Sequence, residues 1–312
     1  MEQKIEQKII SGLLLVDKDK GPTSHDIVNK VRNIFNVKQV GHAGTLDPFA
    51  TGLLLVGIGK ATRLLEYLQG ETKVYKVKMQ LGIITDTFDI TGTVMEENNI
   101  NNSEREIIEA INSFIGTYKQ VPPAYSAKKY QGKKLYELAR EGKIINLPPR
   151  EVTIYEISDI KIELPYVEFT TKVSAGTYIR SLCMDIGYKL GCGATTVELR
   201  RTKVGKFDVG NAVRIDENIE KVKGHVIPME EILDLPKIVI LDKTKVYNGI
   251  HPKVEDLISY DNFKKDDLVQ IFADGKLIAI AMAERNSSFI ETLKKQSRNE
   301  RILTLEKVFR LD

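Results

Sequence analysis

The sequence has few of the residues that build disulfide frameworks and metal sites. Its 312 residues include two cysteines and four histidines. None of the histidines stands at zinc-ligand spacing from a cysteine, so the sequence predicts no metal site. The two cysteines, Cys183 and Cys192, favour a reducing compartment over a disulfide scaffold.

Long hydrophobic runs are also missing. No apolar stretch approaches the ~18 residues that a membrane helix needs, and residues 1–10 lack the apolar core of a signal peptide. We therefore expect a protein of the cytoplasm with no membrane association. Hydrophobic residues make up 42% of the chain and charged residues 29%, as is usual for globular proteins, and the length accommodates two domains.

The chain as a whole has no large charge of one sign, with a net charge of +3, but one segment does. Residues 117–150 hold eight Lys or Arg against two Glu, together with four of the twelve tyrosines. Proline pairs at 122–123 and 148–149 mark residues 122–149 as an insertion. Interleaved cations and aromatic rings suit an RNA backbone with exposed bases, and a solvated lysine-rich loop is the alternative. Three lysines are predicted RNA contacts here: Lys128, Lys129 and Lys133.

One carboxylate lies in a loop that cannot be regular structure. Residues 41–52 read GHAGTLDPFATG, in which three glycines permit unusual backbone angles. Pro48 fixes its own φ and biases Asp47 toward an extended conformation. Such a loop holds the Asp47 carboxylate at a defined place with room for a ligand. The alternative is an ordinary turn with a local aspartate hydrogen bond.

Hydrophobic periodicity predicts a chain of mixed strands and helices. We expect strands at 12–16, 53–58, 73–81, 152–164, 167–174 and 195–199, and helices at 59–68, 104–115 and 176–190. A further helix, capped by Thr23 or Ser24, is expected to have its apolar positions at Ile27, Val31, Ile34 and Phe35. A domain boundary is expected at 230–236. Beyond it, short strands at 238–241, 268–272, 277–283 and 302–305 and a helix within 242–249 indicate a small β-barrel or sandwich.

Three further side chains stand out by their position. Tyr75 opens the apolar face of the 73–81 strand, where a core ring is the simple interpretation. Arg180 lies in the first turn of its helix, where a cation opposes the helix dipole, so it is expected to meet an anion, either a buried aspartate or a phosphate. Lys20 lies in a turn with Lys18 and Asp19 that would reach a phosphate, although a solvated turn is the simpler interpretation.

Taken together, five segments resemble the TruB family of tRNA pseudouridine synthases. They occur in the family's order and are residues 17–24 (DKDKGPTS), 41–48 (GHAGTLDP), 73–75 (KVY), 176–180 (GTYIR) and 199–201 (LRR). Asp19 is a departure, because family members usually have proline there. The tail, with ILTLEKVF at 302–309, is similar to a PUA domain.

The resemblance implies an α+β fold. Its parts are a mixed β-sheet pseudouridine synthase core with flanking helices over residues 1–232, a thumb-like insertion at about 122–149, and a small C-terminal PUA-like β-barrel over residues 233–312.

The same resemblance implies a role for each site residue. Asp47 falls on the nucleophile, Tyr75 on the ring that stacks on the flipped base, and Arg180 on the arginine that pairs with the nucleophile. Tyr178 and Leu199 fall on further positions of the base pocket, and His42 on a histidine associated with remodelling of the RNA.

The implied substrate is the T-loop uridine of tRNA, at position 55. The PUA-like domain would face the acceptor stem. No cofactor and no obligatory protein partner is implied.

The chemistry of uridine isomerisation agrees with these residues. A carboxylate can form a covalent adduct at the sugar or at carbon 6 of the base, and the sequence does not choose between them. An adjacent arginine is expected to lower the pKa of Asp47, so that its carboxylate is available at neutral pH.

Two other functions compete with a stand-alone enzyme. One is a non-catalytic RNA-binding or tRNA-folding protein, and the other is a guide-RNA-dependent relative similar to dyskerin. The intact set of Asp47, Tyr75 and Arg180 favours catalysis over binding alone. The basic insertion favours direct contact with RNA over dependence on a guide.

Overall fold

The computed structural model describes residues 10–123, 129–130, 133–134, 147–216 and 218–310, with backbone alone for 129–130 and 133–134. The chain packs into two compact units. The larger comprises Leu14–Ile58 and Leu65–Val226, and the smaller comprises Met1–Leu13, Gly59–Leu64 and Ile227–Asp312. The domain boundary expected between 232 and 233 stays a prediction. Within the described ranges, no helix is both long enough and apolar enough to cross a membrane.

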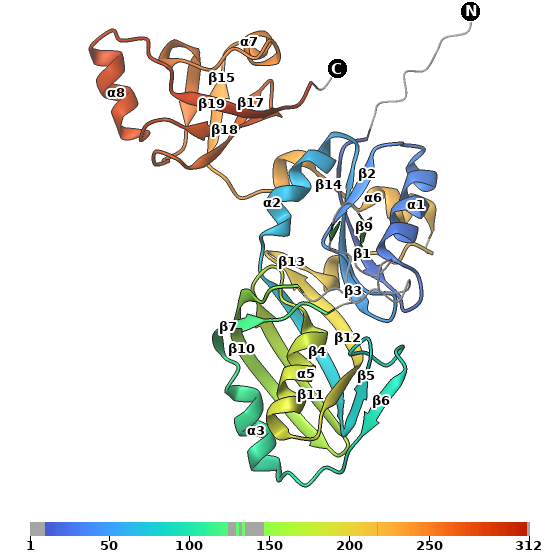
Figure 1. Ribbon diagram of the computed structural model, residues 1–312. Coiled ribbons are helices and arrows are strands. Elements are labelled where there is room, and N and C mark those ends of the chain that lie inside the picture. The colour runs from blue at the N-terminus through green and yellow to red at the C-terminus, as the bar shows by residue number, and fades with distance from the viewer. Residues whose placement is uncertain (1–9, 124–128, 131–132, 135–146, 217, 311–312) are drawn as a thin grey trace, which may run out of the picture. The chain divides into compact units, whose positions relative to one another are not determined.

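The larger unit is built on one mixed sheet (Figure 1). Its strands are β1 (Gly12–Lys18), β2 (Val40–Ala43), β3 (Thr51–Ile58), β4 (Lys73–Leu81), β7 (Gly116–Gln120), β10 (Arg150–Glu163), β11 (Tyr166–Val173), β12 (Ala194–Val204) and β13 (Phe207–Asp208). Neighbours follow the order β1-β3-β12-β4-β11-β10-β7, with β2 beside β3 and β13 beside β12. β12 pairs in parallel with β3 and antiparallel with β4.

Helices and short strands complete this unit. They are α1 (Ser24–Phe35), α2 (Leu65–Gln69), α3 (Glu104–Asn112), α5 (Ile179–Leu190), α6 (Ile219–Gly224), β5 (Ile83–Thr85), β6 (Val94–Glu97), β8 (Lys129–Tyr130), β9 (Lys133–Lys134) and the 3₁₀ turn η2 (Val209–Asn211). The strand β14 (Val226–Pro228) begins at Val226, the last residue of the larger unit. Thr23 and Ser103 cap α1 and α3 through capping boxes, which satisfy the first backbone N–H groups of each helix.

The pairing of β3 with β12 depends on a glycine. Gly52 has φ of +101°, and a Cβ there would lie 2.2 Å from the backbone oxygen of Arg201. No other residue fits, because a side chain would push the two strands apart. This close approach brings the loop that precedes β3, which holds Asp47, next to the side chains of β12.

The smaller unit holds a five-stranded sheet of its own. Its strands are β15 (Lys237–Ile240), β16 (Leu257–Tyr260), β17 (Leu268–Ala273), β18 (Lys276–Ala283) and β19 (Leu303–Val308), in the order β16-β15-β17-β18-β19. Also present are α7 (Lys243–Tyr247), α8 (Ser288–Lys295), η1 (Gly59–Leu64), η3 (Met229–Glu231) and η4 (Val254–Asp256). In the part of the chain that is described, no pairing of β16 with β19 closes the sheet, so the predicted PUA-like barrel stays a prediction.

Most of the predicted elements are present. The strand at 73–81 has the expected bounds, and the strands at 12–16 and 195–199 extend to residues 18 and 204. The helix at 59–68 is instead the 3₁₀ turn η1 followed by α2. Residues 117–120, which we counted in the basic segment, belong to β7 of the core sheet. Most of the predicted insertion lies outside the described residues.

Candidate active site

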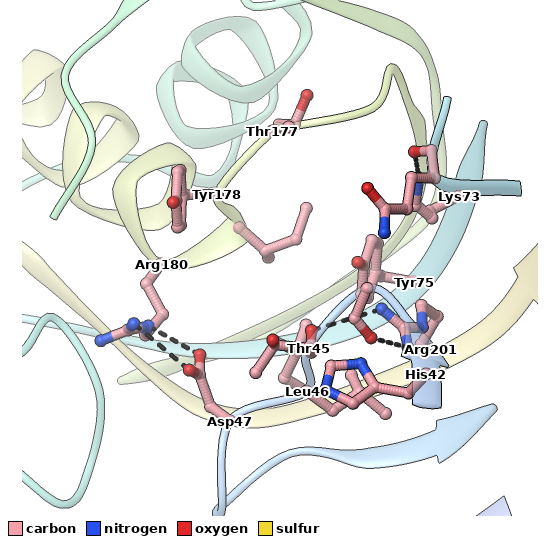
Figure 2. A pocket seen from close by; sticks show the side chains of 15 residues that line it. His42, Thr45, Leu46, Asp47, Lys73, Tyr75, Thr177, Tyr178, Arg180 and Arg201 are labelled. Atoms are coloured by element: carbon pink, nitrogen blue, oxygen red, sulfur yellow. Dashed lines mark hydrogen bonds and ion pairs between the residues drawn. The ribbon is translucent and has the colours of Figure 1, made fainter. Parts of the chain in front are cut away.

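A cavity of about 390 Å³ opens in the larger unit, a size typical of small-molecule sites (Figure 2). Its lining comes from β2 and the loop between β2 and β3, the end of α2, the start of β4, the start of α5 with the residues just before it, and β12. The residues are His42, Gly44, Thr45, Leu46, Asp47, Gln69, Lys73, Tyr75, Gly176, Thr177, Tyr178, Ile179, Arg180, Leu199 and Arg201. Of the predicted site residues, the cavity brings together Asp47, Tyr75, Arg180, His42, Tyr178 and Leu199. Their roles stay predictions.

Side chains from other elements fix the backbone of the Asp47 loop. The Ser24 hydroxyl accepts a hydrogen bond from the Leu46 N–H (2.9 Å) and donates one to the Leu46 carbonyl (3.1 Å). The Gly21 N–H donates to the Pro48 carbonyl (2.8 Å). The backbone on both sides of Asp47 is therefore held, although the segment has no regular structure.

Lys18 holds the same loop from β1. Its side chain is buried, and its Nζ donates to the carbonyls of Ala50 (2.7 Å), Asp19 (3.0 Å) and Pro48 (3.4 Å). Burial lowers the pKa of Lys18 to about 8. The solvated turn that we expected is therefore wrong for Lys18. Lys20, the predicted phosphate contact, is exposed and does not line the cavity.

Arg201 holds the other end of the loop from β12. Its Nε donates to the Leu53 carbonyl (2.8 Å), and its terminal nitrogens donate to the carbonyls of Gly44 (3.1 Å) and Thr45 (3.5 Å). The side chain is 1% exposed. Two buried cations on separate strands thus bind the carbonyls on either side of Asp47.

Arg180 lies between two carboxylates. Its Nε is 3.0 Å from Asp47 Oδ2, and one of its terminal nitrogens is 3.0 Å from Asp89 Oδ2 and donates to the Thr87 carbonyl (2.7 Å). The other terminal nitrogen donates to Asp47 Oδ1 (3.4 Å). In Figure 2 the Asp47 carboxylate points at the Arg180 guanidinium.

We did not predict Asp89 as part of the site. It lies in the turn between β5 and β6, and its Oδ1 accepts hydrogen bonds from the Thr91 N–H (3.0 Å) and hydroxyl (2.5 Å). The one signal in the sequence was indirect, because Arg180 at a helix start indicated an anionic partner without saying which one.

The pKa of Asp47 is raised above its ordinary value. Burial in the cavity is the largest cause, Arg180 and Lys18 oppose it, and the Asp89 charge adds to it. Arg180 acts on the pKa of Asp47 in the expected direction, but the expected net lowering is wrong, because burial outweighs the ion pair. The guanidinium still favours the ionised carboxylate.

The remaining predicted residues form the walls. Tyr75 is buried in β4, in register with Arg201 on β12, and Leu199 lies two residues before Arg201. Figure 2 shows Tyr75 and His42 on one side of the cavity and Tyr178 with Arg180 on the other. Hydrophobic and aromatic surfaces therefore stand on both sides of the space beside Asp47.

Lys73 was not predicted to be part of the site. Its Nζ donates to the carbonyls of Gln69 (2.8 Å) and Glu71 (2.6 Å), and burial, with the nearby Arg201 charge, lowers its pKa to about 8. Of the three lysines predicted in the insertion, Lys128 lies outside the described residues. Lys129 and Lys133 lie on the paired strands β8 and β9, where the backbone alone is described.

These features suit covalent chemistry on a planar ligand. A carboxylate fixed in direction by a guanidinium can act as a nucleophile, and aromatic rings offer faces on which a base can stack. Among the described residues, no group of three or more His, Cys, Asp or Glu side chains could hold a metal ion.

Comparisons with known proteins show which family this chain is similar to. The model of the TruB family pseudouridylate synthase N-terminal domain matches residues 32–179, and that of the tRNA pseudouridylate synthase B C-terminal domain matches residues 180–234. The tRNA pseudouridine synthase B of Thermotoga maritima is 55% identical over 303 residues, covering 96% of this chain and 98% of the relative. That of Thermosipho melanesiensis is 53% identical over 305 residues, covering 96% and 99%.

Two solved structures resemble the whole chain. One is a chain of an H/ACA RNP bound to a substrate RNA containing 2′-deoxyuridine, with a TM-score of 0.72 and 29% identity over 99% of this chain and 88% of its own. The other comes from a Cbf5-Nop10-Gar1 complex, with a TM-score of 0.72 and 30% identity over the same shares. The family models cover most of the chain, including every residue of the cavity, and the chain therefore belongs to the TruB family of pseudouridine synthases.

Proposed function

We propose that this protein converts the T-loop uridine at position 55 of tRNA to pseudouridine, with Asp47 as the nucleophile. The observation that carries the proposal is the ion pair of Arg180 with Asp47 at the edge of a cavity that also presents Tyr75. Relatives at 55% identity are named tRNA pseudouridine synthase B, which supports tRNA as the substrate.

The reaction exchanges one glycosidic bond for another. The bond from C1′ to N1 of the uracil breaks, a bond from C1′ to C5 forms, the C5 proton leaves to solvent, and N1 gains a proton. Asp47 forms the covalent adduct that separates the two steps, either at C1′ or at carbon 6 of the base. Arg180 directs the carboxylate and keeps it ionised when the site is desolvated by the bound nucleotide.

The uracil reaches Asp47 after leaving the base stack. Extruding a base costs a few kcal/mol, and stacking on an aromatic ring returns ~1–3 kcal/mol. Tyr75 supplies that ring, Tyr178 and Leu199 form the remaining walls, and His42 lies where the RNA around the flipped base would pass.

Contacts outside the cavity hold the rest of the tRNA. The basic segment 122–149 binds the backbone of the T arm, with Lys20 as a further phosphate contact. The sheet of the smaller unit acts as a PUA-like module directed toward the acceptor stem. On this proposal, no protein partner is required.

The test is the formation of pseudouridine in an unmodified tRNA transcript with no other macromolecule present. The wild-type chain should modify position 55, and Asp47→Asn should abolish the reaction while retaining tRNA binding. Turnover by Asp47→Asn within tenfold of wild type would refute the nucleophile. Binding without turnover by the wild type would favour the RNA-folding alternative, and activity that needs a guide RNA would favour the dyskerin-like one.

A further inference from the structure

One buried amide binds both backbone polar groups of a cavity residue. Gln120, the last residue of β7, is 1% exposed. Its Oε1 accepts from the Tyr178 N–H (2.8 Å), and its Nε2 donates to the Tyr178 carbonyl (3.1 Å) and to the Tyr118 hydroxyl (2.6 Å). The Gln120 side chain therefore pairs with both the N–H and the carbonyl of Tyr178, as the backbone of a neighbouring β-strand would. Because the Tyr178 N–H needs an acceptor, these contacts also fix which way the amide faces.

Tyr178 is the residue at which α5 begins. It is the N-cap residue of α5, its own side chain makes no capping hydrogen bond, and Arg180 follows two residues later. The position of the Tyr178 backbone thus sets both the direction of its ring into the cavity and the start of the turn that carries the guanidinium.

Further hydrogen bonds join α5 to β7 and to the residue that follows it. The Tyr118 hydroxyl donates to Asp185 Oδ2 (3.1 Å), and the Ser181 hydroxyl donates to the Val121 carbonyl (2.9 Å). Because Tyr118 uses its hydrogen on Asp185, its oxygen is left to accept from Gln120. Gln120 therefore lies at the centre of a hydrogen-bond network in which the donor and the acceptor of each bond are fixed.

We propose that Gln120 is a positioning residue for the isomerisation, which holds Tyr178 so that Arg180 reaches Asp47 and Asp89 together. This inference rests on the proposed function. Gln120 does not line the cavity, so it acts through Tyr178 and Arg180. Displacing a catalytic group by about 1 Å can lower a rate ~100-fold, which is far more than two lost hydrogen bonds imply for stability.

The test compares opposite ends of α5. Gln120→Leu removes the contacts with Tyr178, and Gln120→Glu keeps the shape of the side chain but removes the donor. Asn102→Leu is the matched control, because Asn102 Nδ2 donates to the Leu190 carbonyl (3.2 Å) at the far end of the helix. We expect kcat on unmodified tRNA to fall ~10–100-fold in both Gln120 variants, with the Kd for tRNA within threefold of wild type and little change in Asn102→Leu.

Two further readouts separate positioning from stability. When Arg180 moves away, the pKa of Asp47 rises further, so the acid limb of kcat/KM should move to higher pH in the Gln120 variants and stay in place in Asn102→Leu. The ¹⁵N-labelled Nε–H resonance of Arg180, identified by its loss in Arg180→Lys, should shift in the same variants without any need for turnover.

Several outcomes would overturn the proposal. If the Gln120 variants match Asn102→Leu in kcat, acid limb and Arg180 resonance, Gln120 has only a structural role. If Gln120→Leu does not fold, the isosteric Gln120→Glu decides. An inactive wild type would count against the proposed function, and the Arg180 resonance would still decide the role of Gln120.

Discussion

The two carboxylates on Arg180 differ in their access to solvent. The side chain of Asp47 is 35% exposed and that of Asp89 is 5% exposed. Asp89 is also bonded by Thr91, whereas Asp47 faces the cavity. We infer a division of labour in which Asp89 anchors the guanidinium and Asp47 is the group free to react.

The pH dependence of Asp89→Asn tests this division. Because the Asp89 charge raises the pKa of Asp47, its removal should lower that pKa and move the acid limb of kcat/KM to lower pH. At the same time kcat should fall at least ~10-fold, because the guanidinium loses a charged anchor. Asp86→Asn in the same turn, where the amide oxygen can still accept from the Thr93 N–H, should change neither. An acid limb that moves upward would contradict the division.

Tyr75 offers a test of base stacking. Tyr75→Phe keeps the ring and Tyr75→Ala removes it, so only the alanine variant should lose much affinity for a T-arm hairpin carrying 5-fluorouridine at the target position. The expected loss corresponds to ~1–3 kcal/mol. Equal affinities would make Tyr75 a core residue, and full turnover by Tyr75→Phe would remove the hydroxyl from the chemistry.

At the scale of single residues, the sequence predicted where the charged side chains lie better than it predicted their pKa values. The Gly- and Pro-containing loop indicated that Asp47 was held in place, and the helix start indicated an anion for Arg180. The direction of the pKa shift of Asp47 depends on how much water the folded cavity excludes, which a motif does not show. Lys18 was predictable in part, since it continues the period-two face of Leu14 and Val16 on β1.

At the scale of elements, α5 is anchored at both ends. Gln120 binds its N-cap residue, Tyr178, and Asn102 binds its last residue, Leu190. The sequence predicted the helix and its end at Leu190, because Gly191 follows there, but it placed the start at residue 176 instead of Ile179. It did not predict the anchors, because each joins residues more than fifty positions apart.

The pairing of β3 with β12 is another contact between distant segments that the sequence did not predict. The apolar runs predicted both strands, and the strong alternation of β4 predicted which face holds Tyr75. The parallel register that places Arg200 opposite Thr51 brings β12 to the Asp47 loop, and no local pattern encodes it. The motifs therefore predicted part of the cavity lining, but not how the segments that carry it come together.

One prediction for the basic insertion, residues 122–149, rests on its sequence alone. Neutralising Lys128, Lys129, Lys133 and Lys134 should weaken binding to all T-arm sequences alike. If all four lysines contact phosphates, the slope of log affinity against log salt should become shallower by ~3–4. In limited proteolysis, tRNA should protect this segment. An unchanged slope together with unchanged cleavage would identify a solvated surface loop.

For the whole molecule, buried lysines link stability to alkaline pH. The pKa values of Lys18 and Lys73 are about 8 in the folded chain, against ~10.4 in an unfolded one. Between these values the unfolded chain binds more protons, so the free energy of unfolding should gain a contribution that grows as the pH rises from about 8 toward 10.4.

Urea unfolding of Lys73→Met at several pH values measures this contribution. The rise should be smaller in Lys73→Met than in the wild type, and unchanged in Lys76→Met, which alters an exposed residue on the same strand. Identical pH profiles for the wild type and Lys73→Met would show that burial of Lys73 does not affect its protonation.

Two residues of the cavity wall are held in the same way, by one side chain that bonds with both the backbone N–H and the backbone carbonyl. Ser24 does so for Leu46 and Gln120 does so for Tyr178. Loss of the Ser24 hydroxyl therefore removes the side-chain partner of both backbone groups of Leu46. Loss of the Gln120 amide removes the partner of the Tyr178 N–H, whereas the Tyr178 carbonyl still accepts from the Leu182 N–H (3.1 Å). Each buried group left unpaired costs ~1–3 kcal/mol. Neutral drift at these positions is confined to residues that present a donor and an acceptor at the same reach, and sequences selected in the laboratory for retained tRNA modification should vary less at 24 and 120 than at the exposed residues beside them.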